Sequence, residues 1–134
     1  MTIGHHALRG SRPGQKPAHV HFKQEEILFI IEGLYEVTVG DETAEVRPGS
    51  IVFIPRNVVH RFKNIGGITG RMLGWSLPGG QDHYLKAISE LAAGGGFTSE
   101  KVMEISRTFD THFPVESRMP RASSEKAQEE RNPP

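Results

Sequence analysis

The chain has 134 residues, of which 36% are hydrophobic, and its sixteen basic and sixteen acidic side chains cancel to a formal charge of zero. This length fits one domain with a modest core. The balanced charge lacks the long-range field that attracts proteins to nucleic acid or to an anionic membrane, so we expect small-molecule or protein partners. Cysteine is absent, which excludes disulfides and thiolate ligands and leaves only nitrogen and oxygen atoms to hold a metal.

Targeting and membrane signals are also missing from the sequence. No stretch approaches the roughly 18 apolar residues of a membrane span, and residues 1–10 contain no apolar run preceded by positive charge. We therefore expect a soluble cytoplasmic protein that does not bind a membrane.

The first half of the chain predicts β-structure. Residues 1–18 are polar and contain Pro13, Gly14 and Pro17, which indicates an irregular arm. The pattern then alternates with a period of two from Ala18, which predicts an extended segment with His19 and His21 on one face. Strand-like runs separated by Gly/Pro turns follow at 26–32, 34–39, 43–46, 50–54, 58–63 and 71–77. Short strands at this spacing favour an antiparallel sandwich or a small barrel.

The second half predicts two helices and a tail. Apolar residues recur at helical spacing after Asp82, a candidate N-cap, and Gly94 ends the pattern. Thr98 or Ser99 can cap a second helix. We expect both helices to cover a sheet face, with a lid or partner-binding role as the alternative. The resulting division is an N-terminal arm at 1–13, a barrel at 14–80, a helical extension at 81–112 and a disordered tail at 113–134, where aromatic residues vanish after Phe113.

Four potential metal ligands stand out, namely His19, His21, Glu26 and His60. On a strand, the first two histidines point the same way with β-carbons about 6.6 Å apart. Glu26 follows after a short gap, and His60 comes from a distant strand. These side chains can meet only if the sheet curls, which favours a barrel interior. Spacing alone leaves open the alternative that they are ordinary core or surface residues.

Two segments resemble the paired motifs of the cupin family. Residues 14–33, GQKPAHVHFKQEEILFIIEG, resemble the first motif, G(X)5HXH(X)3,4E(X)6G, and residues 49–64, GSIVFIPRNVVHRFKN, resemble the second, G(X)5PXG(X)2H(X)3N. There are two departures: Gly14 precedes His19 by four residues instead of five, and Asn57 replaces a glycine. Because Asn tolerates positive φ better than other non-glycine residues, we expect the turn at Asn57 to persist.

The resemblance implies an all-β fold, a double-stranded β-barrel (jelly roll) with a short C-terminal α-helical extension. It also implies a divalent metal ion, either Fe, Mn, Ni, Cu or Zn, held by His19, His21, Glu26 and His60. The six-residue gap to Gly33 and the side-chain parity favour Glu26 over Glu25 as the carboxylate ligand.

A substrate pocket should lie beside these ligands. Strand alternation places Leu28 and Ile30 inward after Glu26, and Phe62 inward after His60. Tyr35 and Phe53 are further candidates for the lining, with ordinary core packing as the alternative.

The first functional hypothesis is a metal-dependent dioxygenase that acts on an aromatic or enolic small molecule, because an apolar lining from Leu28, Ile30 and Phe62 suits a planar organic substrate. Residues 82–109 also resemble the C-terminal extension of small cupins of the quercetin-dioxygenase type. Four protein ligands would leave one or two coordination positions open, and Glu26 could act as a catalytic base. A cyclase or isomerase that uses the metal as a Lewis acid, and a non-catalytic small-molecule-binding barrel, are the alternatives. Many such cupins carry extra strands before the first motif, so we expect a homodimer to cover an exposed sheet edge here.

Overall fold

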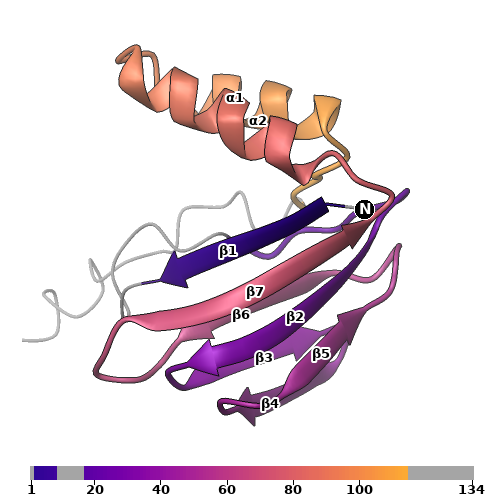
Figure 1. The fold of residues 1–134 in the computed structure, drawn as a ribbon. Coiled ribbons are helices and arrows are strands. Elements are labelled where there is room, and N and C mark those ends of the chain that lie inside the picture. The colour runs from indigo at the N-terminus through magenta and orange to yellow at the C-terminus, as the bar shows by residue number, and fades with distance from the viewer. Residues whose placement is uncertain (1, 9–16, 115–134) are drawn as a thin grey trace, which may run out of the picture.

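The computed structural model describes residues 2–8 and 17–114, and it contains two antiparallel sheets that face each other (Figure 1). The strands of the first sheet lie in the order β1-β7-β2-β5 and those of the second in the order β4-β3-β6. The predicted double-stranded barrel with a helical extension is therefore confirmed. The elements are β1 (Thr2–Leu8), β2 (Glu25–Glu32), β3 (Tyr35–Val39), β4 (Glu42–Val46), β5 (Ile51–Ile54), β6 (His60–Asn64), β7 (Gly70–Leu77), α1 (Gln81–Ala93) and α2 (Ser99–Thr108).

The N-terminal strand β1 corrects the prediction of an irregular arm. Thr2–Leu8 pair with β7 along their whole length, from Thr2 opposite Ser76 to Leu8 opposite Gly70. The segment lacks a period-two apolar pattern. It therefore forms a strand because it pairs with the edge of β7, and not because of its own strand propensity. β1 covers the edge of β7 and is itself the edge strand of this sheet, so the homodimer expected to cover an exposed edge stays a prediction.

Residues 9–16 and 115–134 lie outside the described part of the chain. The disordered tail is predicted for residues 113–134. Only Phe113 and Pro114 of this range lie within the described part of the chain. Among the described residues, neither helix is long and apolar enough to cross a membrane.

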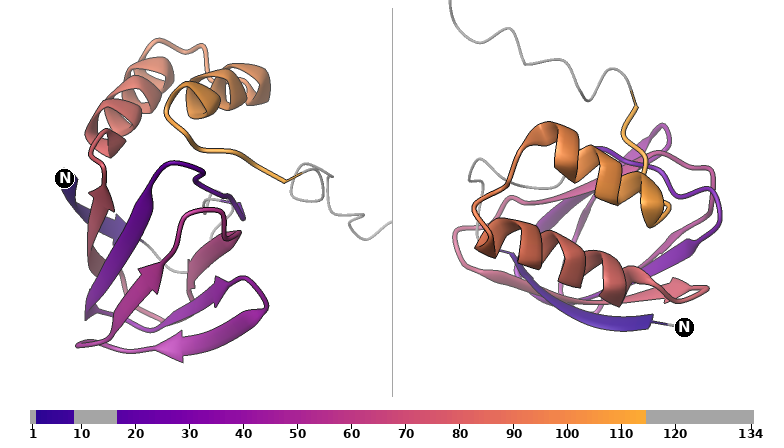
Figure 2. Two further views of the ribbon diagram at one scale, coloured as in Figure 1. Left: turned by 90° about the vertical axis from the view of Figure 1, so that its right-hand side faces the viewer. Right: turned by 90° about the horizontal axis from the view of Figure 1, so that it is seen from above.

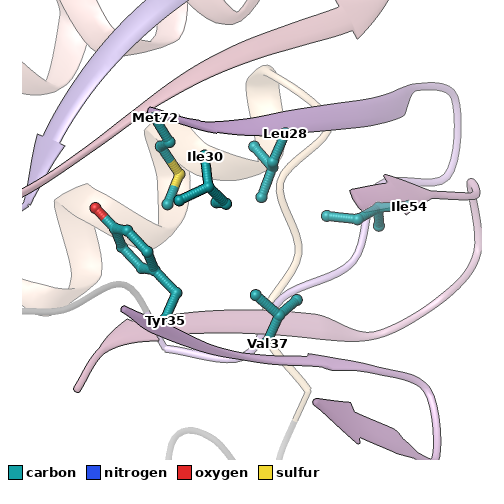
Figure 3. Packing of buried hydrophobic residues seen from close by; sticks show 6 residues of the cluster. All are labelled: Leu28, Ile30, Tyr35, Val37, Ile54 and Met72. Atoms are coloured by element: carbon teal, nitrogen blue, oxygen red, sulfur yellow. The ribbon is translucent and has the colours of Figure 1, made fainter. Parts of the chain in front are cut away.

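The hydrophobic core lies between the two sheets. It consists of six buried side chains that face one another from β2, β3, β5 and β7 (Figure 3), namely Leu28, Ile30, Tyr35, Val37, Ile54 and Met72. Burial raises the pKa of the Tyr35 phenol, and the charge of Glu32 raises it further. The phenol therefore remains neutral in the folded core.

The outer face of the first sheet is also apolar. Ile27 lies between Phe53 on β5 and Trp75 on β7, and Phe29 lies between Ile51 and Leu73 in the same way. Phe53 is 54% exposed and Ile51 is 71% exposed, so the prediction that Phe53 lines the internal pocket is wrong. The next residue, Ile54, faces the core instead, because successive side chains on a strand alternate between faces.

The two helices lie over one end of the sandwich on the side of β1, rather than against the outer face of a sheet as expected (Figures 1 and 2). They are joined by a buried hydrogen bond of 3.1 Å between Tyr84 Oη and Ser106 Oγ. Thr98, one of two predicted caps, accepts a hydrogen bond from Lys101 N at the start of α2. The cap predicted at Asp82 is wrong, since Gly80 occupies that position and Asp82 lies in the first turn of α1.

A close approach at Gly70 yields a stability prediction. A Cβ atom at this buried glycine would overlap the Tyr35 hydroxyl and would lie 2.5 Å from Tyr35 Cζ. We expect Gly70→Ala to lower the free energy of unfolding by about 1–3 kcal/mol, because overpacking forces the core apart. Gly67→Ala is the matched control, since nothing lies within 4 Å of its Cβ position. Urea denaturation measures both variants, and equal free energies of unfolding would contradict this account of the core.

Candidate metal centre

The four predicted ligands meet at one end of the barrel. His19 and His60 face each other in an antiparallel bridge, with His19 N donating to His60 O at 3.0 Å and His60 N donating to His19 O at 2.8 Å. His60 begins β6, and Glu26 is the second residue of β2. The expected regular strand around His19 and His21 is reduced to isolated bridges at His19 and Val20. The backbone there is held by separate partners instead of one continuous ladder.

The side chains of these residues converge. One potential ligand atom from each of His19, His21, Glu26 and His60 lies within 4.8 Å of all the others. Glu26 Oε2 is 3.3 Å from His60 Nε2 and 3.6 Å from His21 Nε2. The three histidines are almost fully buried. The side chain of Glu26 is 16% exposed, so the site remains accessible on the carboxylate side.

Backbone carbonyl groups determine which nitrogen of each imidazole faces the centre. His19 Nδ1 lies 3.0 Å from Pro17 O, His60 Nδ1 lies 2.9 Å from Val58 O, and His21 Nδ1 lies 2.7 Å from Asp110 O. A carbonyl oxygen can only accept, so each Nδ1 carries the proton and donates it. Each Nε2 then presents a lone pair, which is the arrangement found in histidines that bind metals.

This donor set fits a divalent metal ion. Ligand atoms about 2.0–2.2 Å from a common centre are separated from one another by roughly 3–4 Å, and the distances from Glu26 Oε2 to His21 Nε2 and His60 Nε2 lie in this range. His60 Nε2 is buried and has no hydrogen-bond partner among the described residues. Burying such an atom unsatisfied is costly unless a ligand meets it. Nitrogen and carboxylate ligands of this kind suit Fe, Mn, Ni, Cu or Zn and do not select one of them.

Glu25, the neighbouring carboxylate, points elsewhere. Its Oε1 lies 3.3 Å from Arg56 Nη2 in a partly exposed ion pair. Strand parity therefore separates the two glutamates as predicted, with Glu26 directed to the histidines and Glu25 to the surface.

The predicted pocket residues occupy three different settings. Leu28 and Ile30 face inward as expected and, together with Tyr35, are fully buried in the core. Phe62 is partly buried and packs against that core, whereas Phe53 lies on the outer face. Core packing therefore accounts for Tyr35, and Leu28 continues the interior face of β2 directly beyond Glu26.

The turn at Asn57 has the predicted conformation. Asn57 has φ 68°, in the left-handed region where glycine is usually preferred. Its backbone N–H donates to His21 O at 2.7 Å. This hydrogen bond therefore links the turn of the second motif to the segment that contains His19 and His21.

Three residues beside the site were missed by sequence reasoning. Ser76 on β7 lies directly opposite Glu26, and its hydroxyl is buried without a hydrogen-bond partner in the described part of the chain. The side chain of buried Gln24 donates to Gly79 O and accepts from Gln81 Nε2. Asp110 holds His21. The alternation along β7 could have placed Ser76 inward, but no local pattern points to Asp110.

The family model described as "Cupin domain" matches residues 11–76. The chain belongs to the cupin superfamily. Within this cupin, the matched region contains all four residues of the candidate metal centre.

The chain is similar to bacterial relatives in sequence and to solved structures in fold. The chain is 39% identical over 66 residues to an uncharacterized protein of Streptomyces coelicolor, covering 48% of this chain and 59% of that one. It is 36% identical over 73 residues to the polyketide synthase CurC of Streptomyces cyaneus, covering 54% of this chain and 47% of that one. The cupin domain of Schizosaccharomyces pombe Cnp3 is 20% identical with a TM-score of 0.53, covering 63% of this chain and 60% of that chain. This cupin thus spans roughly half the length of the curated relatives it matches.

Metal binding should stabilise the folded protein through these ligands. At a Zn²⁺ concentration of 100 times the dissociation constant, we expect the free energy of unfolding to rise by about 2.7 kcal/mol relative to protein in EDTA. His60→Ala should remove most of this increase. His83→Ala, whose side chain is 73% exposed on α1, should leave it unchanged. Urea denaturation with and without Zn²⁺ measures the effect, and an equal increase in wild type and His60→Ala would count against the site.

Proposed function

We propose that this cupin is a metal-dependent enzyme that acts on an aromatic or enolic small molecule. The observation that supports it most directly is the position of Glu26, which is a partly exposed carboxylate adjoining three buried imidazoles. When bound, a divalent ion supplies a Lewis acid for an enolate or phenolate oxygen, and a redox-active ion also supplies electron transfer to O2.

Glu26 has the position of the proton-transferring group. Its side chain is 16% exposed, whereas those of His21 and His60 are 3% and 1% exposed. A substrate that enters the site therefore meets the carboxylate, which can take a proton from a hydroxyl group or from a carbon next to a carbonyl group. The histidines would not transfer this proton in the metal-loaded protein, because each Nε2 lone pair would be bound to the ion and each Nδ1–H is donated to a carbonyl group.

The surroundings of Glu26 favour a mostly apolar substrate with one polar edge. Ile54 on β5 and Ser76 on β7 are the cross-strand neighbours of Glu26 on either side. Ile54 presents apolar surface, and the Ser76 hydroxyl is a buried group that can donate to a substrate oxygen. Binding would then satisfy a hydroxyl that is costly to leave without a partner.

A dioxygenase is the first candidate reaction. Glu26 would deprotonate an enol or phenol, and both atoms of O2 would enter the organic product. The three buried histidines would limit the access of water to the reacting molecule, which would reduce hydrolytic side reactions.

A cyclase is the second candidate, and the similarity to the polyketide synthase CurC favours it. Molecules that carry 1,3-dicarbonyl groups have acidic carbons between the carbonyls. In this reaction Glu26 takes a proton from such a carbon, the resulting enolate carbon bonds to a ketone carbon of the same molecule, and Glu26 returns the proton to the new alkoxide. The new carbon–carbon bond closes the ring, loss of the hydroxyl group and a neighbouring hydrogen as water introduces a double bond, and no oxidant is consumed.

Turnover of enolic compounds tests the proposal. We expect a flavonol or a 1,3-diketone to be consumed by Fe-, Mn-, Ni- or Cu-loaded protein, and Glu26→Gln to lower the rate by about 10²–10⁴-fold because the base is lost. Glu25→Gln is the matched control and should retain the wild-type rate, because Glu25 faces Arg56. Liquid chromatography measures substrate loss, and an oxygen electrode measures O2 uptake.

The two measurements also separate the candidate reactions. Uptake of one O2 per substrate consumed supports the dioxygenase, whereas product formation under anaerobic conditions supports the cyclase. Metal-loaded protein that binds these compounds but never transforms them would overturn the enzyme proposal and favour a non-catalytic binding barrel.

We further propose that a second copy of the chain covers the apolar outer face of the first sheet, so that the protein is a homodimer. The centre of this face, formed by Ile27, Phe29, Ile51, Phe53, Leu73 and Trp75, contains no charged residue. Two copies related by a two-fold axis can therefore oppose it without like-charge repulsion. Residues 115–134 have no aromatic residue and many charged ones, which makes them a poor cover for such a surface.

Light scattering coupled to size-exclusion chromatography tests the dimer. We expect a dimeric mass at micromolar concentration for the wild type and a monomeric mass for Phe53→Glu, because a buried charge opposes association. Ile68→Glu is the control, since Ile68 is 57% exposed but lies outside this face, in the connection between β6 and β7. A monomeric wild type, or a Phe53→Glu variant that stays dimeric, would contradict the proposal.

A further inference from the structure

His21 is held differently from the other two histidines. His19 and His60 each donate Nδ1–H to the carbonyl group two residues earlier in the chain. His21 instead donates to Asp110 O at 2.7 Å, across a sequence separation of 89 residues. One of the three imidazoles is thus oriented by the segment that follows α2, outside both cupin motifs.

Asp110 also forms hydrogen bonds with the backbone that directly follows His21. Its carboxylate accepts hydrogen bonds from Phe22 N at 3.1 Å and from Lys23 N at 2.7 Å. The side chain of Asp110 is 12% exposed, and the two hydrogen bonds lie at the surface of the protein. A carboxylate acceptor makes them stronger than hydrogen bonds between neutral groups. Asp110 therefore contacts the imidazole through its carbonyl group and the next two peptide units through its carboxylate.

The position of Asp110 is itself firmly set by the end of α2. Asp110 has φ 54°, a conformation that Asp tolerates better than most residues. The following residue, Thr111, is fully buried and donates its N–H to Ser106 O at 2.8 Å. Val20 and His112 then exchange two backbone hydrogen bonds, of 2.9 and 3.0 Å.

We propose that Asp110 is a positioning residue for the metal centre and that, through it, the C-terminal helical extension sets the metal affinity of the barrel. The carboxylate holds the backbone at residues 22 and 23, which keeps the Asp110 carbonyl group in line with His21 Nδ1. That hydrogen bond directs His21 Nε2 at the other three ligands. The extension is then part of the metal centre as well as a cover for one end of the sandwich.

This inference rests on the metal site of the proposed function but not on the reaction. The full-length protein is titrated with Zn²⁺ against a chromogenic chelator, and the visible absorption spectrum of the Co²⁺-loaded protein reports the coordination geometry. Asp110→Ala keeps the carbonyl acceptor of His21 but removes the carboxylate that holds residues 22 and 23. We therefore expect it to weaken Zn²⁺ binding about 10-fold, the lower end of the effect of removing the partner of a ligating histidine, and to alter the Co²⁺ spectrum. Asp110→Asn keeps one acceptor oxygen and tolerance of positive φ, so it should lose less affinity.

Two controls distinguish positioning from general destabilisation. Asp41→Ala, in the exposed turn between β3 and β4, should leave both readouts unchanged. In a His21→Ala background, Asp110→Ala should cause no further loss of Zn²⁺ affinity, because the imidazole that it positions is gone.

Other outcomes would overturn the inference. If folded Asp110→Ala and Asp110→Asn bind Zn²⁺ with wild-type affinity and show the wild-type Co²⁺ spectrum, Asp110 only stabilises the fold. If Asp110→Ala does not fold, the Zn²⁺ affinity and the Co²⁺ spectrum of Asp110→Asn alone test the inference. A wild-type protein that fails to bind Zn²⁺ or Co²⁺ would instead remove the metal premise of the proposed function.

Discussion

The candidate metal centre depends on three hydrogen bonds from imidazole to backbone carbonyl groups. Each one places the proton on Nδ1 and directs Nε2 inward, toward the Glu26 carboxylate. A free imidazole would share its proton between both nitrogens and rotate about its side-chain bonds. Because the carbonyl groups belong to the backbone around the bridge and the turn, the geometry of the ligands is a direct product of the fold.

At this end of the barrel, the inward-facing side chains of β2 change from polar to apolar. Glu26 starts the inward-facing series on β2 that continues with Leu28 and Ile30 into the core. Glu26, at the first inward position, therefore belongs to the candidate metal centre, and Leu28 and Ile30, at the later positions, belong to the core. The unsatisfied Ser76 hydroxyl opposite Glu26 marks the boundary between these two regions, since a purely structural core would have little reason to retain it.

Local sequence patterns predicted most of the barrel and the four residues that meet at the candidate metal centre, because the motifs encode turns and side-chain parity over short distances. The separation of Glu25 from Glu26 and the left-handed turn at Asn57 follow from such local rules. Phe53 was misplaced because a four-residue apolar strand does not reveal which parity faces inward until its pairing with β2 is known. β1 was missed because its strand conformation comes from pairing with β7, and Asp110 because its contacts with residues 21–23 span almost the entire domain.

The hydrogen bond between His21 and Asp110 has a consequence for the order in which the protein matures. The acceptor lies 89 residues after the histidine, so a chain emerging from the ribosome exposes His19, His21, Glu26 and His60 well before Asp110 has been synthesised. Contacts of such separation form late, because a long loop must close first. On the proposed role of Asp110, the nascent barrel would bind a metal ion more weakly than the finished protein, and metal binding would be coupled to completion of the C-terminal segment.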